Sequence, residues 1–287
     1  AFKQRFRLIK GDIRDKSLIK NIFDDAEKSN SSIEAVIHFA GLKAVSESVL
    51  FPTLYWDVNV GGSINLMQIM EQYKCWKIVF SSSATIYSPQ GISPLSEDAE
   101  IKPTNPYGQT KATVENLLKN VYESNESNWK IINLRYFNPV GAHPSGLIGE
   151  DPCGEINNLF PYINQVAFGI RDKLTIFGND WPTCDGTGVR DYIHIMDLAD
   201  AHCLALDFLI NKNESQIFSI NIGTGKGTSV LELLNTYEKV NQCKIPYVFS
   251  SRRPGDVGIN FAKNELASSI LNWIPKRDLN DMCKDGW

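Results

Sequence analysis

The chain has 287 residues, of which 43% are hydrophobic and 22% charged, as is typical of a folded globular protein with one large or two modest domains. Its net charge of −4 excludes the strongly basic surface that nucleic acids and anionic membranes require, so we expect neither as a partner. No apolar run approaches the roughly 20 residues of a membrane span. We therefore expect small-molecule chemistry or a protein partner, with a cytoplasmic enzyme as the default.

The six cysteines contain no C-x-x-C pair and no metal-like spacing to the four histidines, which predicts free thiols and no metal site. We expect none of the histidines to have a serine, cysteine or metal-ligand partner close to it. We interpret all four as structural residues: His38, His143, His194 and His202.

The first half of the chain alternates short buried strands with helical patterns. Strands are predicted at residues 6–13, 34–41, 77–83 and 129–141, and helices at 15–29, 52–73 and 106–124. This alternation requires parallel strands joined by right-handed crossovers. It predicts a doubly wound, Rossmann-like α/β sheet over residues 1–137.

After about Asn138 the pattern loosens into loops rich in glycine, proline and aspartate between shorter elements. We expect residues 138–287 to form a smaller, mixed α/β substrate domain over the carboxyl edge of the sheet. A late strand at residues 213–223 and a helix at 228–240 indicate that the two domains share some elements.

The segment "NPYGQTK" places Tyr107 and Lys111 four residues apart, on one face of a helix that begins at Pro106. A lysine so placed favours the ionised form of the phenol. With 10 tyrosines and 29 lysines plus arginines, roughly one such pair is expected by chance. "YKCWK", with Tyr73 and Lys77, is a second match, so spacing alone does not identify a site.

Position in the sheet separates the two pairs. Polar or glycine residues follow three predicted strands, at Gly41 and Lys43, at Ser81–Ser83, and at Asn138. Ligands bind at the carboxyl ends of the strands in doubly wound sheets. Tyr107 begins the helix after the serine run and is predicted at this edge, whereas Tyr73 and Lys77 are predicted at the opposite edge.

The chain resembles the extended short-chain dehydrogenase/reductases, and within them the UDP-glucose 4-epimerase family. The resemblance runs from about Lys10 to Trp287, and its motifs follow the family's order and spacing. They are "GDIRD", "VIHFAGLKAVSESV", "FSSSATIY", "PYGQTK", "LRYFNPVGAHPSG", "GEDP", "IFGNDWPTCDGTGVRDYIHIMDLADAH" and "RRPGD".

The resemblance implies an NAD-dependent interconversion of UDP-galactose and UDP-glucose in galactose metabolism. Tyr107 would take the proton from the sugar 4-hydroxyl, Lys111 would lower the pKa of Tyr107, and Ser83 would share the proton. Hydride would leave C4 for NAD and return to the other face of a 4-keto sugar, so that the cofactor is regenerated.

The family pattern also implies the binding residues. The cofactor set is Asp12, Ile13, Phe39, Ala40, Gly41, Lys43, Asn59, Ser83, Tyr107, Lys111 and Phe137. The UDP-sugar set is Ser83, Tyr107, Asn138, Asn158, Leu159, Thr175, Phe177, Arg190, Arg253, Asp256 and Asn260. The resemblance further implies a homodimer built on the helix after Pro52 and the helix that contains Tyr107.

The sequence departs from the family pattern at its start. The family's opening strand, glycine-rich phosphate loop, first helix and second strand have no counterpart, so we expect a sheet shortened at its N-terminal end and weak NAD retention. Asn260 stands where residue size is associated with acceptance of N-acetylated sugars, so acceptance of these sugars is plausible. "INIGTGKG" resembles a dinucleotide fingerprint but lacks its third glycine at the right offset, and we interpret it as a strand-to-helix turn.

Two alternatives stay open. A nucleotide-sugar dehydratase or decarboxylase is related, but such enzymes carry carboxylates after the serine run, where Ala84 and Thr85 stand here. The other alternative is an inactive protein that retains nucleotide-sugar binding or dimerisation.

Overall fold

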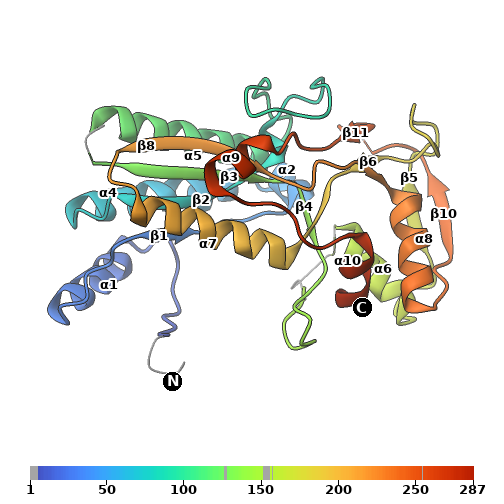
Figure 1. Ribbon diagram of the computed structural model, residues 1–287, viewed down its shortest axis with the longest axis horizontal. Coiled ribbons are helices and arrows are strands. Elements are labelled where there is room, and N and C mark those ends of the chain that lie inside the picture. The colour runs from blue at the N-terminus through green and yellow to red at the C-terminus, as the bar shows by residue number, and fades with distance from the viewer. Residues whose placement is uncertain (1–5, 126–127, 151–155, 157, 254) are drawn as a thin grey trace.

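The computed structural model describes residues 6–125, 128–150, 156, 158–253 and 255–287 (Figure 1). Its largest sheet has four parallel strands in the order β1-β2-β3-β8. These are β1 (Val36–His38), β2 (Lys77–Ser83), β3 (Lys130–Tyr136) and β8 (Gln216–Ile222). The strand order and the parallel pairing confirm the Rossmann-like α/β class.

Helices cover both faces of this sheet, as expected for a doubly wound fold (Figure 1). Ile78 and Ile131 pack with α1 (Lys16–Lys28), α4 (Gly62–Gln72) and α5 (Pro106–Ser124). Val79 and Ile132, which point the opposite way, pack with α7 (Ile195–Asn211) and α9 (Glu265–Leu271). Because neighbouring residues of one strand face different helices, the strands read as continuous apolar runs in the sequence.

Short helices lead from β1 to α4 and from β2 to α5. They are α2 (Val45–Leu50), α3 (Pro52–Tyr55), the π-helix η2 (Trp56–Gly61) and the 3-10 helix η3 (Ala84–Ile86). The predicted helix at residues 52–73 is therefore a run of α, π and α segments. Gly61 and Gly62 lie where the π-helix returns to α-helix.

The second half carries three small sheets at one end of the large sheet (Figure 1). Their strands are β4 (Asn138–Val140) with β7 (Tyr192–His194), β5 (Leu174–Phe177) with β10 (Tyr247–Ser250), and β6 (Val189–Arg190) between β9 (Thr228–Ser229) and β11 (Ile259–Asn260). Their helices are α6 (Leu159–Ala167), α8 (Val230–Asn241) and α10 (Leu279–Asp285). Strand β8 and helix α7 come from this half of the sequence, but they belong to the large sheet and its cover.

Two sequence expectations need correction. Residues 6–13 do not form a strand, because within the described residues no neighbouring strand offers them hydrogen bonds. The strand predicted at 129–141 is split, since β3 joins the large sheet and β4 pairs with β7.

Five cysteines are free as expected, and Cys153 lies outside the described residues. Over the described ranges, no helix has the length and apolar content that crossing a membrane demands.

Candidate active site

Tyr107, Lys111 and Ser83 meet at the carboxyl end of β2. Helix α5 begins at Pro106, and the Asn105 side chain accepts a hydrogen bond of 2.8 Å from the Gly108 amide, which caps the first turn. A Cβ at residue 108 would lie 2.7 Å from the Thr85 carbonyl oxygen, so glycine there allows α5 to pack closely on η3. This contact fixes Tyr107 beside the end of the strand.

Burial opposes charge on both partners of this pair. The phenol of Tyr107 is 8% exposed, and burial raises its pKa to about 12, although a hydrogen bond with Ser83 acts in the other direction. Burial also lowers the pKa of Lys111 to about 8. The Lys111 Nζ donates to the Ser81 carbonyl at 2.6 Å and lies 5.9 Å from the centre of the Tyr107 ring. Lys111 is therefore a buried cation next to a buried, neutral phenol.

Asn59 links the end of β1 to this pair. Its Oδ1 accepts from the Leu42 amide at 2.7 Å, and its Nδ2 donates to the Leu42 carbonyl at 3.1 Å and to the Thr110 hydroxyl at 3.0 Å. A Cβ on Gly41 would lie 3.1 Å from the Asn59 Oδ1 and 3.9 Å from the Lys111 Nζ. Glycine at 41 thus leaves room for the Asn59 side chain beside the buried Lys111 cation, and positive charge there suits an anionic or polyhydroxylated ligand.

The structure does not bring the remaining predicted cofactor residues into one group. Asp12 is held by Arg14 at 2.7 Å, which lowers the pKa of Asp12 to about 2. Phe39 is 57% exposed and contacts the ring of His202, with 4.7 Å between ring centres. Three further members lie apart from one another: Ile13 packs against Gly62, Ala40 is exposed, and Phe137 is buried with Ile86 and Leu95.

The predicted UDP-sugar residues form separate groups. The Arg190 Nη2 donates to the Asp256 Oδ1 at 2.8 Å, and Asn260 is the register partner of Arg190 on β11. The Arg253 guanidinium lies 3.9 Å from the centre of the Phe177 ring. Three members stand elsewhere: Asn138 begins β4, Leu159 begins α6 after Asn158, and Thr175 lies on β5.

The structure adds residues that sequence reasoning missed. The Thr85 hydroxyl donates to the Ser83 Oγ at 3.0 Å. Glu150 lies 3.6 Å from the Lys43 Nζ and accepts from the Asn158 Nδ2 at 3.3 Å, so it joins a predicted cofactor residue to a predicted substrate residue.

A buried Glu115–Arg135 pair on α5 and β3 was also missed. Glu115 stands four residues after Lys111, between the core positions Val114 and Leu118. An acidic residue between core positions of a helix indicates a buried carboxylate with a partner, and this pattern could have predicted the pair.

The histidines have partners in the structure. His38 is hydrogen-bonded to Ser63 at 2.8 Å and His143 to Ser145 at 2.7 Å, so the expectation that no histidine has a serine partner is wrong. The Ser63 hydroxyl donates its one proton to the Asn59 carbonyl at 2.5 Å, so it can only accept a hydrogen bond from His38.

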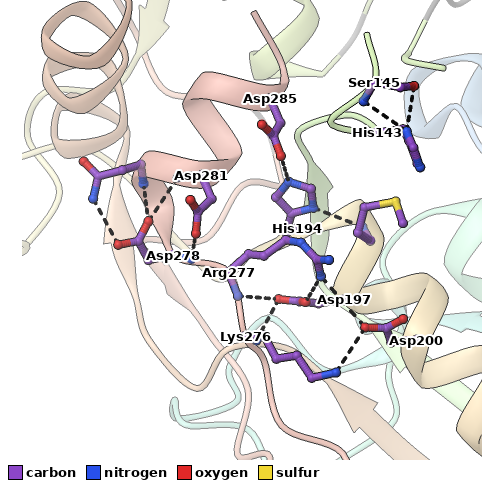
Figure 2. A network of polar contacts seen from close by, with 12 residues as sticks. His143, Ser145, His194, Asp197, Asp200, Lys276, Arg277, Asp278, Asp281 and Asp285 are labelled. Atoms are coloured by element: carbon purple, nitrogen blue, oxygen red, sulfur yellow. Dashed lines mark hydrogen bonds and ion pairs between the residues drawn. The ribbon is translucent and has the colours of Figure 1, made fainter. Parts of the chain in front are cut away.

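Figure 2 shows His194 between the start of α7 and the end of α10. Its Nδ1 accepts from the Met196 amide at 3.0 Å, and its Nε2 lies 3.3 Å from the Asp285 carboxylate. In the first turn of α7, Asp197 pairs with Arg277, which precedes α10. These contacts attach the C-terminal segment to α7, and His194 caps a helix there.

The second tyrosine–lysine pair, Tyr73 and Lys77, lies away from the site. Tyr73 ends α4 and bonds to Asp24, while Lys77 begins β2 and lies 2.9 Å from Glu34, so both are at the amino-terminal edge as predicted.

The glycine-rich segment after β8 is a turn, again as predicted. Its Thr224 and Gly225 amides donate to the buried carboxylate of Asp191 at 2.7 and 3.0 Å. These amides therefore bind a side chain of the protein itself.

Comparison with known protein families gives a match over residues 1–286 to the family described as GDP-mannose 4,6 dehydratase. UDP-glucose 4-epimerase 2 of Oryza sativa subsp. japonica is 51% identical over 97% of this chain and 67% of its own length. UDP-glucose 4-epimerase of Bacillus subtilis (strain 168) is 49% identical over 96% of this chain and 79% of its own length.

Solved structures give the same relationship. UDP-glucose 4-epimerase from Stenotrophomonas maltophila, with bound NAD and formylated UDP-arabinopyranose, superposes with a TM-score of 0.92 and 45% identity. The enzyme from Bifidobacterium longum, in complex with NAD+ and UDP, has a TM-score of 0.89 and 43% identity. Each alignment covers 97% of this chain and 81% of the other.

Proposed function

The chain belongs to the UDP-glucose 4-epimerase family of extended short-chain dehydrogenase/reductases, and we propose that it interconverts UDP-galactose and UDP-glucose with NAD. The observation that carries this proposal is the convergence of Tyr107, Lys111 and Ser83 at the carboxyl end of β2. This is a proton-transfer site in the position where doubly wound sheets bind ligands. Such an enzyme belongs to galactose metabolism.

Tyr107 is the proposed base for the 4-hydroxyl of the sugar, and Ser83 relays the proton. With a pKa of about 12 the phenol is neutral in the chain alone, so it needs added positive charge to act as a base. Lys111 supplies part of that charge, because its ammonium is held beside the ring by the Ser81 carbonyl. Bound NAD supplies the hydride acceptor and donor for C4.

The backbone at Gly41 and the nearby Lys111 ammonium suit a bound dinucleotide. The Lys111 Nζ has three N–H groups, and the hydrogen bond to Ser81 uses one of them. The buried His202 Nε2, beside Phe39 at the same edge, has no hydrogen-bond partner in the described part of the chain. We propose that the predicted cofactor residues that meet at this edge, Phe39, Gly41, Asn59 and Lys111, hold NAD.

We propose that the groups around Arg190 and Phe177 bind the UDP portion of the substrate. A guanidinium such as Arg190 or Arg253 matches phosphate oxygens in a bidentate fashion, and Phe177 offers an aromatic face. In the structure Arg190 is paired with Asp256 and Arg253 lies over Phe177. Substrate phosphate and base would therefore replace contacts that these side chains now make with each other.

Elimination chemistry is the second candidate, because the matching family description names a dehydratase. Here Thr85 follows Ser83 and donates a hydrogen bond to it. A hydroxyl in that place supports proton relay and supplies no carboxylate for elimination. Relatives that are about half identical and named as epimerases also favour epimerisation.

The proposal extends to a cytoplasmic homodimer. Helices α2 and α3 and the π-helix η2 contact α5 and expose apolar side chains, and burial of these side chains against a second copy fits a paired-helix interface. The exposed members are Val49, Leu50, Phe51, Leu54 and Trp56.

The test is conversion of UDP-galactose to UDP-glucose by the purified chain with added NAD. The Tyr107→Phe variant removes the base and keeps the ring, so we expect its kcat to fall by at least about 10²-fold. Tyr73→Phe, at the opposite edge, is the matched control and should keep the wild-type rate. An unchanged rate for Tyr107→Phe contradicts the proposed role, and formation of a dehydrated sugar would establish the second candidate.

A further inference from the structure

Glu115 lies one helical turn after Lys111, and both of its carboxylate oxygens accept hydrogen bonds. Glu115 accepts from the Arg135 Nε at 3.0 and 3.1 Å and from the Arg135 Nη2 at 2.6 Å, while the Ser82 hydroxyl donates to its Oε1. The side chains of Glu115 and Arg135 are only 7% and 5% exposed. Both carboxylate oxygens are therefore occupied inside the core.

Arg135 is itself held in one position. Its Nη1 donates to the Tyr87 hydroxyl at 3.1 Å and to the Glu97 carbonyl at 2.9 Å. Tyr87 in turn donates to Asn221 on β8 at 2.6 Å. The guanidinium is thus fixed between β3, β8 and the segment that follows β2.

Lys111 would otherwise be a natural partner for Glu115. Lysine and glutamate four residues apart on a helix are close enough to pair, and burial strengthens the attraction. Across the residues that the structure describes, however, Lys111 makes no ion pair, and its Nζ points to the Ser81 carbonyl at the end of β2. The carboxylate that could withdraw it is already bound by Arg135 and Ser82.

We propose that Arg135 is a positioning residue that holds Glu115 and so prevents this carboxylate from drawing Lys111 away from Tyr107. The consequence for catalysis rests on the proposed epimerase function. The side-chain arrangement itself exists without substrate and can be tested without turnover.

The pKa of Lys111 reports on its distance from Glu115. Burial lowers its pKa to about 8, and the charge of Glu115 opposes that shift. The other titratable groups near it are Tyr107 on α5 and His38 on β1, while Tyr136 on β3 acts on Tyr107. A direct contact with Glu115 raises the pKa of Lys111, because an opposite charge at close range favours the ammonium.

The test compares Arg135→Met with the double variant Glu115→Gln/Arg135→Met. In Arg135→Met, Glu115 is free to capture Lys111. We expect the pKa of Lys111, followed by NMR of labelled lysine, to rise by about one or more. The kcat for UDP-galactose should fall at least about tenfold with little change in KM, because the tyrosinate loses its cation.

The double variant removes the competing carboxylate as well. We expect it to recover most of the lost kcat and to return the pKa of Lys111 toward the wild-type value. Glu123→Gln, at the exposed end of α5 where Glu123 lies 3.7 Å from Lys119, is the matched control and should match the wild type in both measurements.

Each outcome supports or overturns the positioning role of Arg135. Equal loss of kcat in the single and double variants, with the pKa of Lys111 unmoved, would mean that the pair only stabilises the fold. If Arg135→Met does not fold, the double variant decides alone: near-wild-type kcat supports the proposal, and an inactive or unfolded double variant overturns it. A wild-type chain that converts no UDP-galactose contradicts the proposed function, yet leaves the lysine titration as a separate test.

Discussion

At the scale of single residues, His38 is the clearest case of a side chain whose proton is fixed by its surroundings. Ser63 donates its proton to the Asn59 carbonyl, so its oxygen must accept from the His38 Nε2–H. His38 therefore carries a proton on Nε2. Burial, and then the nearby charge of Lys111, lower the pKa of His38 from 6.5 to about 4.

This lowered pKa makes the stability of the fold depend on pH. Between pH 6.5 and pH 4 the unfolded chain binds a proton at this position and the folded chain does not, so stability is full above pH 6.5 and is lost as the pH falls toward 4. The shift corresponds to roughly 3 kcal/mol of unfolding free energy at pH 4. Urea unfolding across this range should show that loss.

His38→Gln keeps a donor for Ser63 but cannot titrate, so it should remove most of the His38 contribution to the pH dependence. His143→Gln, in the loop after β4, is the control and should keep the wild-type slope. Identical slopes for wild type and His38→Gln would show that other groups cause the acid sensitivity.

The residue scale also shows what spacing can and cannot predict. Tyr107–Lys111 and Tyr73–Lys77 have the same spacing, and only their places at opposite ends of parallel strands separate them. Strand direction follows from the alternation of strands and helices, so this distinction could be predicted. The partner of Glu115 could not, because Arg135 lies on a strand 20 residues later and contact depends on how α5 packs on β3.

At the scale of elements, the prediction was most accurate where the determinants are local. Helix α5 begins at the predicted proline because its cap, Asn105, is adjacent in the sequence. The strand predicted at residues 6–13 is wrong because a strand requires a partner, which the local pattern does not reveal. The π-helix η2 was not predicted, because its i→i+5 hydrogen-bonding pattern is rare and is not specified by apolar spacing alone.

Asp191 holds two separate segments of the chain in place through hydrogen bonds to its carboxylate. It stands between β6 and β7 and is fully buried. Its carboxylate accepts from the amides of Thr224, Gly225 and Ala262 at 2.7, 3.0 and 3.1 Å, and from the Thr224 hydroxyl at 2.6 Å. The turn after β8 and the segment after β11 are thereby held against β6.

Asp191→Asn replaces one acceptor oxygen with an NH2 group that faces N–H donors. Since each hydrogen bond to a charged group contributes about 1.5–3 kcal/mol, we expect the variant to lose about 3 kcal/mol of unfolding free energy in urea. Asp180→Asn, which breaks an exposed pair with Arg252, should change it by less than about 1 kcal/mol. A loss no larger than in that control would show that the turn is stable without the carboxylate.

At the scale of the whole molecule, the exposed apolar side chains are not spread evenly. Val49, Leu50, Phe51, Leu54 and Trp56 follow one another on α2, α3 and η2, and their exposed fractions run from 39% to 72%. Contiguous apolar surface of this kind on a folded protein marks a binding surface. These helices lie against α5, so association through this surface would buttress the helix that carries Tyr107 and Lys111.

Leu54→Glu tests whether this surface joins two copies. A glutamate near a two-fold axis meets its own copy and is desolvated without a partner, so we expect the dimer to dissociate in sedimentation velocity experiments. Ile170→Glu, which places the same charge on a side chain that is 70% exposed just after α6, should leave the wild-type mass unchanged. If the wild-type chain is a monomer at every concentration, the surface has another occupant. If both variants stay dimeric, the interface lies elsewhere, and α5 is held by contacts within its own chain, which include the core residues Val114 and Leu118 and the Glu115–Arg135 pair.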